Sequence, residues 1–288
     1  MVFNRMKARK HGSTEGETEH MLIDYHTHHE RCGHAVGKLE EYIQQGIAIG
    51  LQQIGVSDHM PLLHVNPDEY YPEMAMPMDE LPRYVEEAFA LKDKYKGQID
   101  VRVGLEGDYI EGSEEQIETI VNAYPWDYVI GSVHFLGTWD ITDFRQTHGW
   151  EGRDPMQVYE QYYDAVIKAA NTGFYDYIGH IDVIKRFGFK PAGDVTHLEN
   201  AALEAVRRND LAIELNASGL RHACAEMFPG KRMLDYARQL DIPITIGSDA
   251  HQPARLAEYL DQARARLKEA GFTQLATFER RIRTMVDF

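Results

Sequence analysis

The chain has 288 residues, a length that suits two ordinary domains or one α/β barrel, and its 43% hydrophobic and 26% charged residues exclude collagen-like, low-complexity and wholly disordered classes. Its 46 acidic residues against 30 lysines and arginines give a net charge of −16, which argues against broad capture of nucleic acid or an anionic membrane. Two cysteines, Cys32 and Cys224, cannot form a disulfide framework, and no apolar stretch is long enough for a membrane span or signal peptide. We therefore expect a cytoplasmic protein.

The first twenty residues are polar and lack apolar periodicity, so residues 1–20 are expected to be a disordered extension or an expression remnant before a single domain at 21–288. Short apolar runs then alternate with amphipathic segments. The runs predict strands at 21–25, 53–57, 101–105, 128–133, 175–179, 211–215 and 244–247. The amphipathic segments predict helices at 38–49, 81–95, 114–122, 155–171, 196–209, 231–240, 254–270 and 273–284. This alternation indicates parallel βαβ units.

Histidines and acids follow the predicted strands at the point where each strand ends. They occur in the stretches Asp24-Tyr25-His26-Thr27-His28, Ser57-Asp58-His59, Glu106-Gly107-Asp108, Ser132-Val133-His134, Gly179-His180-Ile181-Asp182 and Ser248-Asp249-Ala250-His251, with His34 following the first. In a parallel barrel all these ends open on one face, so distant residues converge there. A single strand-end histidine is usually structural, but the joint pattern favours a cation cluster. Imidazole and carboxylate together suit zinc, manganese or iron.

In this order the motifs resemble those of the PHP (polymerase and histidinol phosphatase) family, from about Met21 to beyond His251. The resemblance implies a distorted (β/α)7 barrel, similar to a TIM barrel, with the active site at the C-terminal ends of the strands. It also implies three divalent metal ions. The first would be held by His26, His28, Glu106 and Asp249, the second by Glu106, His134 and His180, and the third by His34, His59 and His251.

Clustered metal ions can share a hydroxide, because each lowers the pKa of bound water toward neutrality, and they can neutralise a phosphoryl group. We therefore expect in-line attack of this hydroxide on phosphorus without a phosphoenzyme. An acidic protein must supply phosphate affinity locally, and Arg186 and Arg221 each follow a predicted strand. Their surroundings, His-Ile-Asp-Val-Ile-Lys-Arg-Phe at 180–187 and Glu-Leu-Asn-Ala-Ser-Gly-Leu-Arg at 214–221, resemble the histidinol-phosphatase branch. That resemblance implies phosphate-binding arginines, whereas an arbitrary arginine is more often a solvated surface charge.

The branch further implies a small phosphorylated substrate, with hydrolysis of L-histidinol phosphate to L-histidinol and phosphate in histidine biosynthesis. The leaving group's proton could come from a metal-bound water, from Asp182 or from His222. Asn216, with Glu214, could contact the amine of the substrate, although Asn216 could equally satisfy loop backbone. Side chains of the proline-rich segment 61–82 could cover the imidazole ring or serve ordinary packing; they are Tyr70, Tyr71, Met74 and Met76.

Two other functions are compatible with the fold. One is a phosphodiesterase or exonuclease acting on nucleotides or nucleic-acid ends, but such an enzyme would need an extended basic or aromatic track, and the net charge of −16 opposes one. The other is a non-catalytic module, against which the complete ligand set counts, because buried charges are costly to retain without a use.

Overall fold

The computed structural model describes residues 21–64 and 73–288. The predicted extension at 1–20 lies outside the described residues, as do Tyr70 and Tyr71. Within the described ranges, no helix combines the length and the apolar character needed to cross a bilayer.

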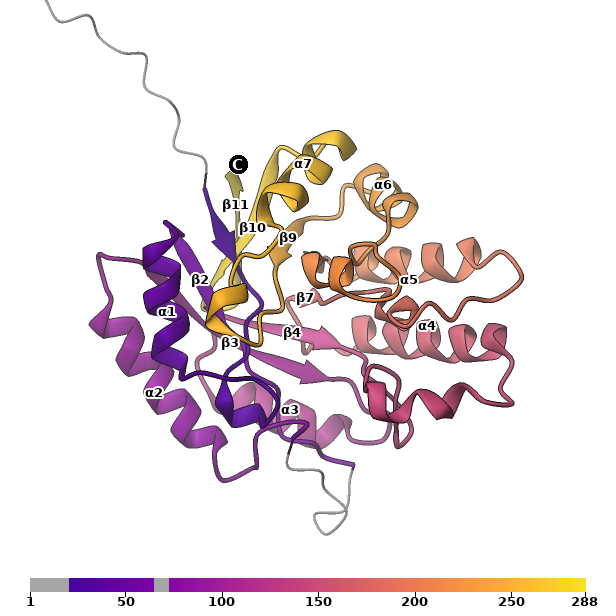
Figure 1. Ribbon diagram of the computed structural model, residues 1–288, viewed down its shortest axis with the longest axis horizontal. Helices are drawn as coiled ribbons and strands as arrows, with labels where there is room; N and C mark the ends of the chain where they lie inside the picture. Colours follow the sequence, from indigo (N-terminus) through magenta and orange to yellow (C-terminus); the bar gives the residue numbers. More distant parts are fainter. Residues whose placement is uncertain (1–20, 65–72) are drawn as a thin grey trace, which may run out of the picture.

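Seven parallel strands of the described chain form one sheet, in the order β1-β2-β3-β4-β7-β8-β9 (Figure 1). Their bounds are β1 Ile23–Asp24, β2 Gln53–Val56, β3 Asp100–Asp108, β4 Tyr128–Ser132, β7 Tyr177–Ile178, β8 Ala212–Asn216 and β9 Ile244–Gly247. The two edges meet, because the Tyr25 amide donates to the Ile246 carbonyl oxygen at 3.0 Å and the His28 amide to that of Ala250 at 2.9 Å. The predicted seven-stranded α/β barrel is thus confirmed.

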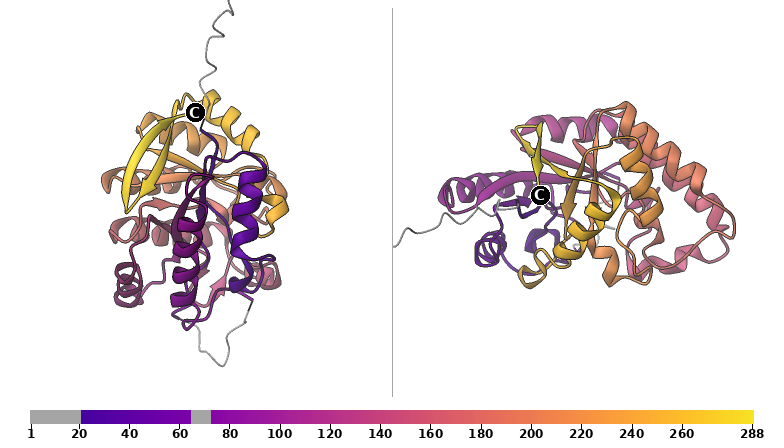
Figure 2. Two further views of the ribbon diagram at one scale, coloured as in Figure 1. Left: turned by 90° about the vertical axis from the view of Figure 1, so that its left-hand side faces the viewer. Right: turned by 90° about the horizontal axis from the view of Figure 1, so that it is seen from above.

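Helices surround this sheet, with α1 and α2 on one side and α4 and α5 on the opposite side (Figures 1 and 2). The helices of the described residues are α1 Leu39–Ala48, α2 Leu81–Lys94, α3 Glu114–Ala123, α4 Pro155–Asn171, α5 Thr196–Arg208, α6 Lys231–Gln239 and α7 Leu260–Ala270. In α4, Val158, Tyr162 and Val166 are buried at a spacing of four residues, which places them on one face toward the sheet. The Asp154 side chain caps this helix by accepting from the Met156 amide at 3.0 Å.

Aromatic side chains fill the barrel at the end opposite the strand C-termini. The hydroxyls of Tyr128 and Tyr177 donate to the Tyr25 carbonyl oxygen at 2.8 and 3.1 Å. Glycine is needed beside this cluster, because a Cβ on Gly104 would lie 2.4 Å from Tyr128 Cζ. The ring of Phe278 stacks on Tyr177 with centroids 5.5 Å apart and closes the bottom of the barrel.

The predicted helix at 273–284 is wrong, because the chain there forms an antiparallel hairpin of β10 (Gln274–Glu279) and β11 (Ile282–Asp287). The turn between them places Arg280 and Arg281 at positive φ, +51° and +64°, where tight hairpins usually carry Asn or Gly. Asp127 holds this unusual turn by accepting from both backbone amides, at 3.2 Å through its side chain and 2.9 Å through its carbonyl. The hairpin therefore depends on a tertiary contact that its own sequence does not predict.

The predicted helix at 254–270 is correct only in its second half. A short 3-10 turn, η5 (Pro253–Arg255), comes first, and Tyr259 at φ +63° interrupts the path before α7. The side chain of Asp24 fixes this connection by accepting from the Ala257 amide at 2.9 Å. Two further short strands, β5 (Phe135–Leu136) and β6 (Trp139–Asp140), form a small hairpin beyond β4.

Candidate metal centre

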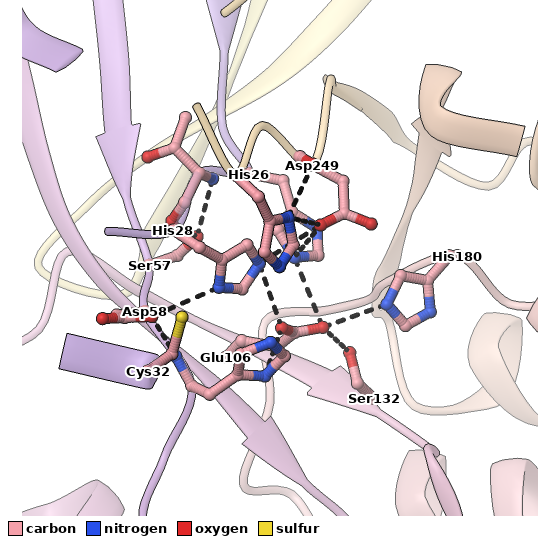
Figure 3. A network of polar contacts seen from close by, with 12 residues as sticks. His26, His28, Cys32, Ser57, Asp58, Glu106, Ser132, His180 and Asp249 are labelled. Carbon is pink, nitrogen blue, oxygen red and sulfur yellow. Dashed lines mark hydrogen bonds and ion pairs between the residues drawn. The ribbon is translucent and has the colours of Figure 1, made fainter. Parts of the chain in front are cut away.

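Glu106, near the end of β3, lies fully buried at the centre of a group of imidazoles (Figure 3). Its Oε1 lies 3.0 Å from His180 Nε2 and 3.3 Å from His26 Nε2. Its Oε2 lies 3.3 Å from His28 Nε2 and 3.0 Å from His59 Nδ1. One carboxylate therefore contacts four histidines that follow three different strands, β1, β2 and β7.

Asp249 and the remaining histidines complete the group above Glu106. Asp249 Oδ1 lies 3.3 Å from His28 Nε2. The Nε2 atoms of His34 and His251 lie 2.9 Å apart, and those of His134 and His180 lie 3.2 Å apart. Two ring nitrogens that face each other this closely fit two ligands of one ion better than two proton donors. The structure therefore gathers all nine predicted ligands at the C-terminal ends of the strands.

The residues present fit metal ions. His26 Nε2, His28 Nε2 and Glu106 Oε2 are buried without a hydrogen-bond partner among the described residues, and the three residues offer ligand atoms within 4.8 Å of one another. Leaving such atoms unsatisfied is costly, and a cation between them would remove the cost. Other groups meet the same distance limit, among them His28 with His59 and His251, and His26 with His180 and Asp249.

A carboxylate behind several of these histidines determines which ring nitrogen faces the cluster. The pairs, joined through Nδ1, are Glu214 with His26 at 2.8 Å, Asp108 with His134 at 2.8 Å, and Asp58 with His28 at 3.3 Å. A carboxylate accepts the Nδ1 proton and leaves Nε2 unprotonated for a metal. Gly247 makes room for one such pair, because a Cβ there would lie 1.9 Å from Glu214 Oε1.

The electrostatics differ between the floor and the mouth of the centre. Burial opposes protonation of His26, but Glu214 and Glu106 outweigh it and raise the pKa of His26 well above its usual value. At the mouth, burial and the neighbouring His59 lower the pKa of His34 to about 3. The floor therefore attracts cations, while the mouth offers a neutral imidazole with a free lone pair.

A cavity of about 500 Å³ opens over the cluster, and both predicted phosphate-binding arginines line it. No described residue accepts a hydrogen bond from, or forms an ion pair with, the guanidinium of Arg186, whose Nε is buried. Arg221 is more constrained, because it donates to Glu258 at 2.8 Å and to the carbonyl oxygens of Ser248 and Asp249 at 3.1 Å each. Arg186 is thus the freer anion ligand, while Arg221 also holds the backbone that carries Asp249.

The structure separates the two candidate proton donors. Asp182 lies outside the cavity, because its Oδ2 pairs with Lys185 Nζ at 2.7 Å and accepts from the Gly230 amide at 2.9 Å, and it lines a different pocket. His222 lines the cavity, but burial and the charges of Arg186 and Arg221 lower its pKa to about 4. A pKa near 4 keeps this imidazole neutral at pH 7 in the free protein.

Of the two roles left open for Asn216, the contacts of the side chain favour the structural one, and Glu214 lies beside it. Both are fully buried behind His26, where the Asn216 amide donates to Glu214 Oε2 at 3.1 Å and its oxygen accepts from the Ser218 amide at 2.9 Å.

The two methionines of the proline-rich segment lie in different surroundings. Met76 is buried in the core, whereas Met74 lines the cavity.

Sequence reasoning did not give Asp108, Glu214 or Ser132 a role at the metal centre. Ser132 donates to Glu106 Oε1 at 2.7 Å and so helps to orient the central carboxylate. A signal was available for Asp108, which stands two residues after Glu106 on a strand and must share its side of the sheet. For Glu214 the signal is weaker, because many strands end in an acidic residue.

Comparisons with known proteins agree with this geometry. Residues 24–218 match the PHP domain family. A probable histidinol-phosphatase of Deinococcus radiodurans is 37% identical, covering 87% of this chain and 94% of that protein, and the histidinol-phosphatase of Bacillus subtilis is 33% identical, covering 80% and 93%. The crystal structure of histidinol phosphate phosphatase from Lactococcus lactis, complexed with zinc, L-histidinol and phosphate, superposes with a TM-score of 0.78 at 25% identity, covering 91% of this chain and 98% of that one. The chain belongs to the PHP domain family.

Proposed function

We propose that this protein hydrolyses L-histidinol phosphate to L-histidinol and phosphate, a reaction of histidine biosynthesis. The observation that carries the proposal is the meeting, in one cavity, of an imidazole and carboxylate cluster with the guanidinium of Arg186, which pairs with none of the described residues. The names of the relatives and the ligands of the Lactococcus lactis structure supply the identity of the substrate.

Three divalent ions, zinc, manganese or iron, are the proposed cofactors. The first would be held by His26, His28, Glu106 and Asp249, the second by Glu106, His134 and His180, and the third by His34, His59 and His251. When bound, such ions supply Lewis acidity, which lowers the pKa of water and neutralises phosphoryl oxygens. Mixed imidazole and carboxylate ligands narrow the list to these three metals, because an all-oxygen ligand set would instead suit Mg²⁺.

The side chains around the cluster then bind and orient the ester. Arg186 would take two phosphoryl oxygens through its planar fork, and Arg221 would add the donors that its contacts with Glu258 and the backbone leave free. His222, neutral at pH 7, would donate a hydrogen bond from its ring N–H to the phosphate or the leaving oxygen. Orientation by fixed donors lowers the barrier because the groups need not reorganise during the reaction.

The test is elemental analysis of protein purified without chelator, followed by turnover of a substrate panel. The panel holds L-histidinol phosphate, other phosphate monoesters, a phosphodiester and single-stranded DNA. We expect bound transition metal, a kcat/KM for L-histidinol phosphate that exceeds the others by at least about 100-fold, and loss of activity on chelation. A His26→Ala, His28→Ala double variant of the same chain serves as the matched metal-deficient control.

Two results would overturn the proposal. Preferential cleavage of single-stranded DNA or of the phosphodiester would indicate the nuclease alternative. Full activity after complete removal of metal would show that the cluster is not the catalytic centre.

A further inference from the structure

Acidic side chains line the cavity in greater number than the metal centre needs. Among the described residues they are Glu73, Glu106, Asp108, Asp140, Asp143 and Asp249. Glu106 and Asp249 contact imidazoles of the centre, and Asp108 contacts His134. Arg145 pairs with Glu73 at 3.0 Å and with Asp143 at 2.9 Å.

Asp140 differs from these five, because no described cation or imidazole lies within ion-pair distance of its carboxylate. It stands in β6 directly opposite Phe135 of β5, and both side chains line the cavity. Its Oδ1 accepts from the Thr142 amide and hydroxyl, each at 2.7 Å, and from the Asp143 amide at 3.1 Å. The loop therefore fixes one oxygen and leaves Oδ2 for a partner in the cavity.

The buried charge of Asp140 is not compensated by an ion pair with a described residue. Asp140 is only 8% exposed, and burial raises its pKa above the ordinary value. Because the loop amides hold the side chain in place, it cannot turn toward water without losing three hydrogen bonds. A cation entering the cavity would compensate the buried charge, and this compensation favours a positively charged ligand over a neutral one of the same shape.

We propose that Asp140 binds the protonated amine of the substrate and so makes the enzyme selective for phosphate esters of amino alcohols. This inference rests on the proposed function. The two charges face one cavity: the guanidinium of Arg186 would bind the phosphate and the carboxylate of Asp140 the ammonium group, and neither forms an ion pair with a described residue. Phe135, beside Asp140, offers an apolar surface to the carbon chain between these two charges.

The test replaces Asp140 with asparagine, whose amide oxygen keeps the three loop hydrogen bonds while the charge is removed. Two substrates are compared, L-histidinol phosphate and the same ester without its amino group. For Asp140→Asn we expect kcat/KM for L-histidinol phosphate to fall by about 10- to 100-fold, chiefly through KM, and kcat/KM for the deaminated ester to change by less than about threefold. The matched control is Glu73→Gln, which removes a carboxylate of the same cavity that Arg145 already neutralises.

Binding of the product provides a readout that does not depend on turnover. By calorimetry on the metal-loaded protein, the Kd of L-histidinol should rise by about 10-fold or more in Asp140→Asn, while the Kd of inorganic phosphate stays unchanged. Equal losses for both esters, or an unchanged Kd for L-histidinol, would overturn the role of Asp140 without touching the proposed function. If the wild-type protein bound L-histidinol but hydrolysed no phosphate ester, the proposed function would fail, and the calorimetric comparison alone would decide the inference.

Discussion

Replacement of Glu214 by glutamine should weaken the metal centre without touching any metal ligand. The carboxylate accepts hydrogen bonds from three sides, at 2.8 Å from His26 Nδ1, 2.9 Å from the His180 amide and 3.1 Å from Asn216 Nδ2. Glutamine has one acceptor oxygen, and its NH2 group cannot accept. At least one of the three contacts must therefore become a contact between two donors, or His26 must move its proton from Nδ1 to Nε2, the atom that faces Glu106.

Both outcomes have a measurable size. Loss of a carboxylate that orients a metal-binding histidine costs about 10- to 100-fold in metal affinity, or about 1.4–2.7 kcal/mol. A buried donor left without an acceptor lowers the free energy of unfolding of the metal-free protein by about 1–3 kcal/mol. Because Glu214 is fully buried, water cannot replace the lost hydrogen bonds and reduce either effect.

Competition with a chromophoric chelator measures metal affinity, and urea denaturation of the metal-free protein measures stability. The matched control is Glu279→Gln, which makes the same change at the opposite end of the barrel, on a side chain that is 62% exposed and pairs with Arg102. That variant should keep wild-type metal affinity. If Glu214→Gln bound metal as tightly as wild type, the carboxylate would not set the orientation of His26.

Four further substitutions separate phosphate binding, stability and proton transfer. Arg186→Ala should raise KM by about 10- to 100-fold at unchanged metal content. Arg221→Ala should also lose metal, because Arg221 holds the Asp249 carbonyl. Equal metal content in both variants, by elemental analysis, would argue against a separate role of Arg221 in metal binding. Phe278→Ala should lower the free energy of unfolding by about 3–5 kcal/mol in urea denaturation and leave metal content unchanged, because the ring is buried at the far end of the barrel. His222→Asn should leave the shape of the pH profile of kcat/KM unchanged from about pH 6 to 9, since a group whose pKa is lowered to about 4 is already neutral there. Disappearance of an alkaline limb in that variant would instead identify His222 as the acid.

The strand ends were predictable from sequence because two simple regularities meet there. Buried parallel strands appear as short apolar runs, and the barrel brings their C-terminal ends to one face, so a histidine after each run predicts a common site. His26 and His28, two apart on an extended chain, needed no further information to be placed side by side. The identity of the metals and the number bound do not follow from this geometry and remain proposals.

What the sequence did not reveal depends on tertiary partners. The hairpin turn at Arg280 and Arg281 carries no glycine or asparagine, and its stability comes from Asp127 at the start of another strand. Asp182 stands two residues after His180 and was one of three candidate proton sources, yet it pairs with the buried cation of Lys185 on the other side. A polar residue near a motif can thus serve the motif or the packing around it, and only the position of its charged partner decides which.

The two ends of the barrel meet opposite physical demands. The C-terminal end gathers buried imidazoles and carboxylates, several of whose atoms find no hydrogen-bond partner in the part of the chain that the structure describes. Without a cation, this end therefore lowers the stability of the fold. The other end holds the stacked rings of Tyr128, Tyr177 and Phe278 and receives the C-terminal hairpin, so it contributes the apolar burial that the centre lacks. Because metal ions bind the folded chain and not the dispersed ligands of the unfolded one, their binding free energy adds to that burial. The hairpin that sequence reasoning assigned to the wrong secondary structure therefore helps to keep the predicted centre assembled before metal arrives.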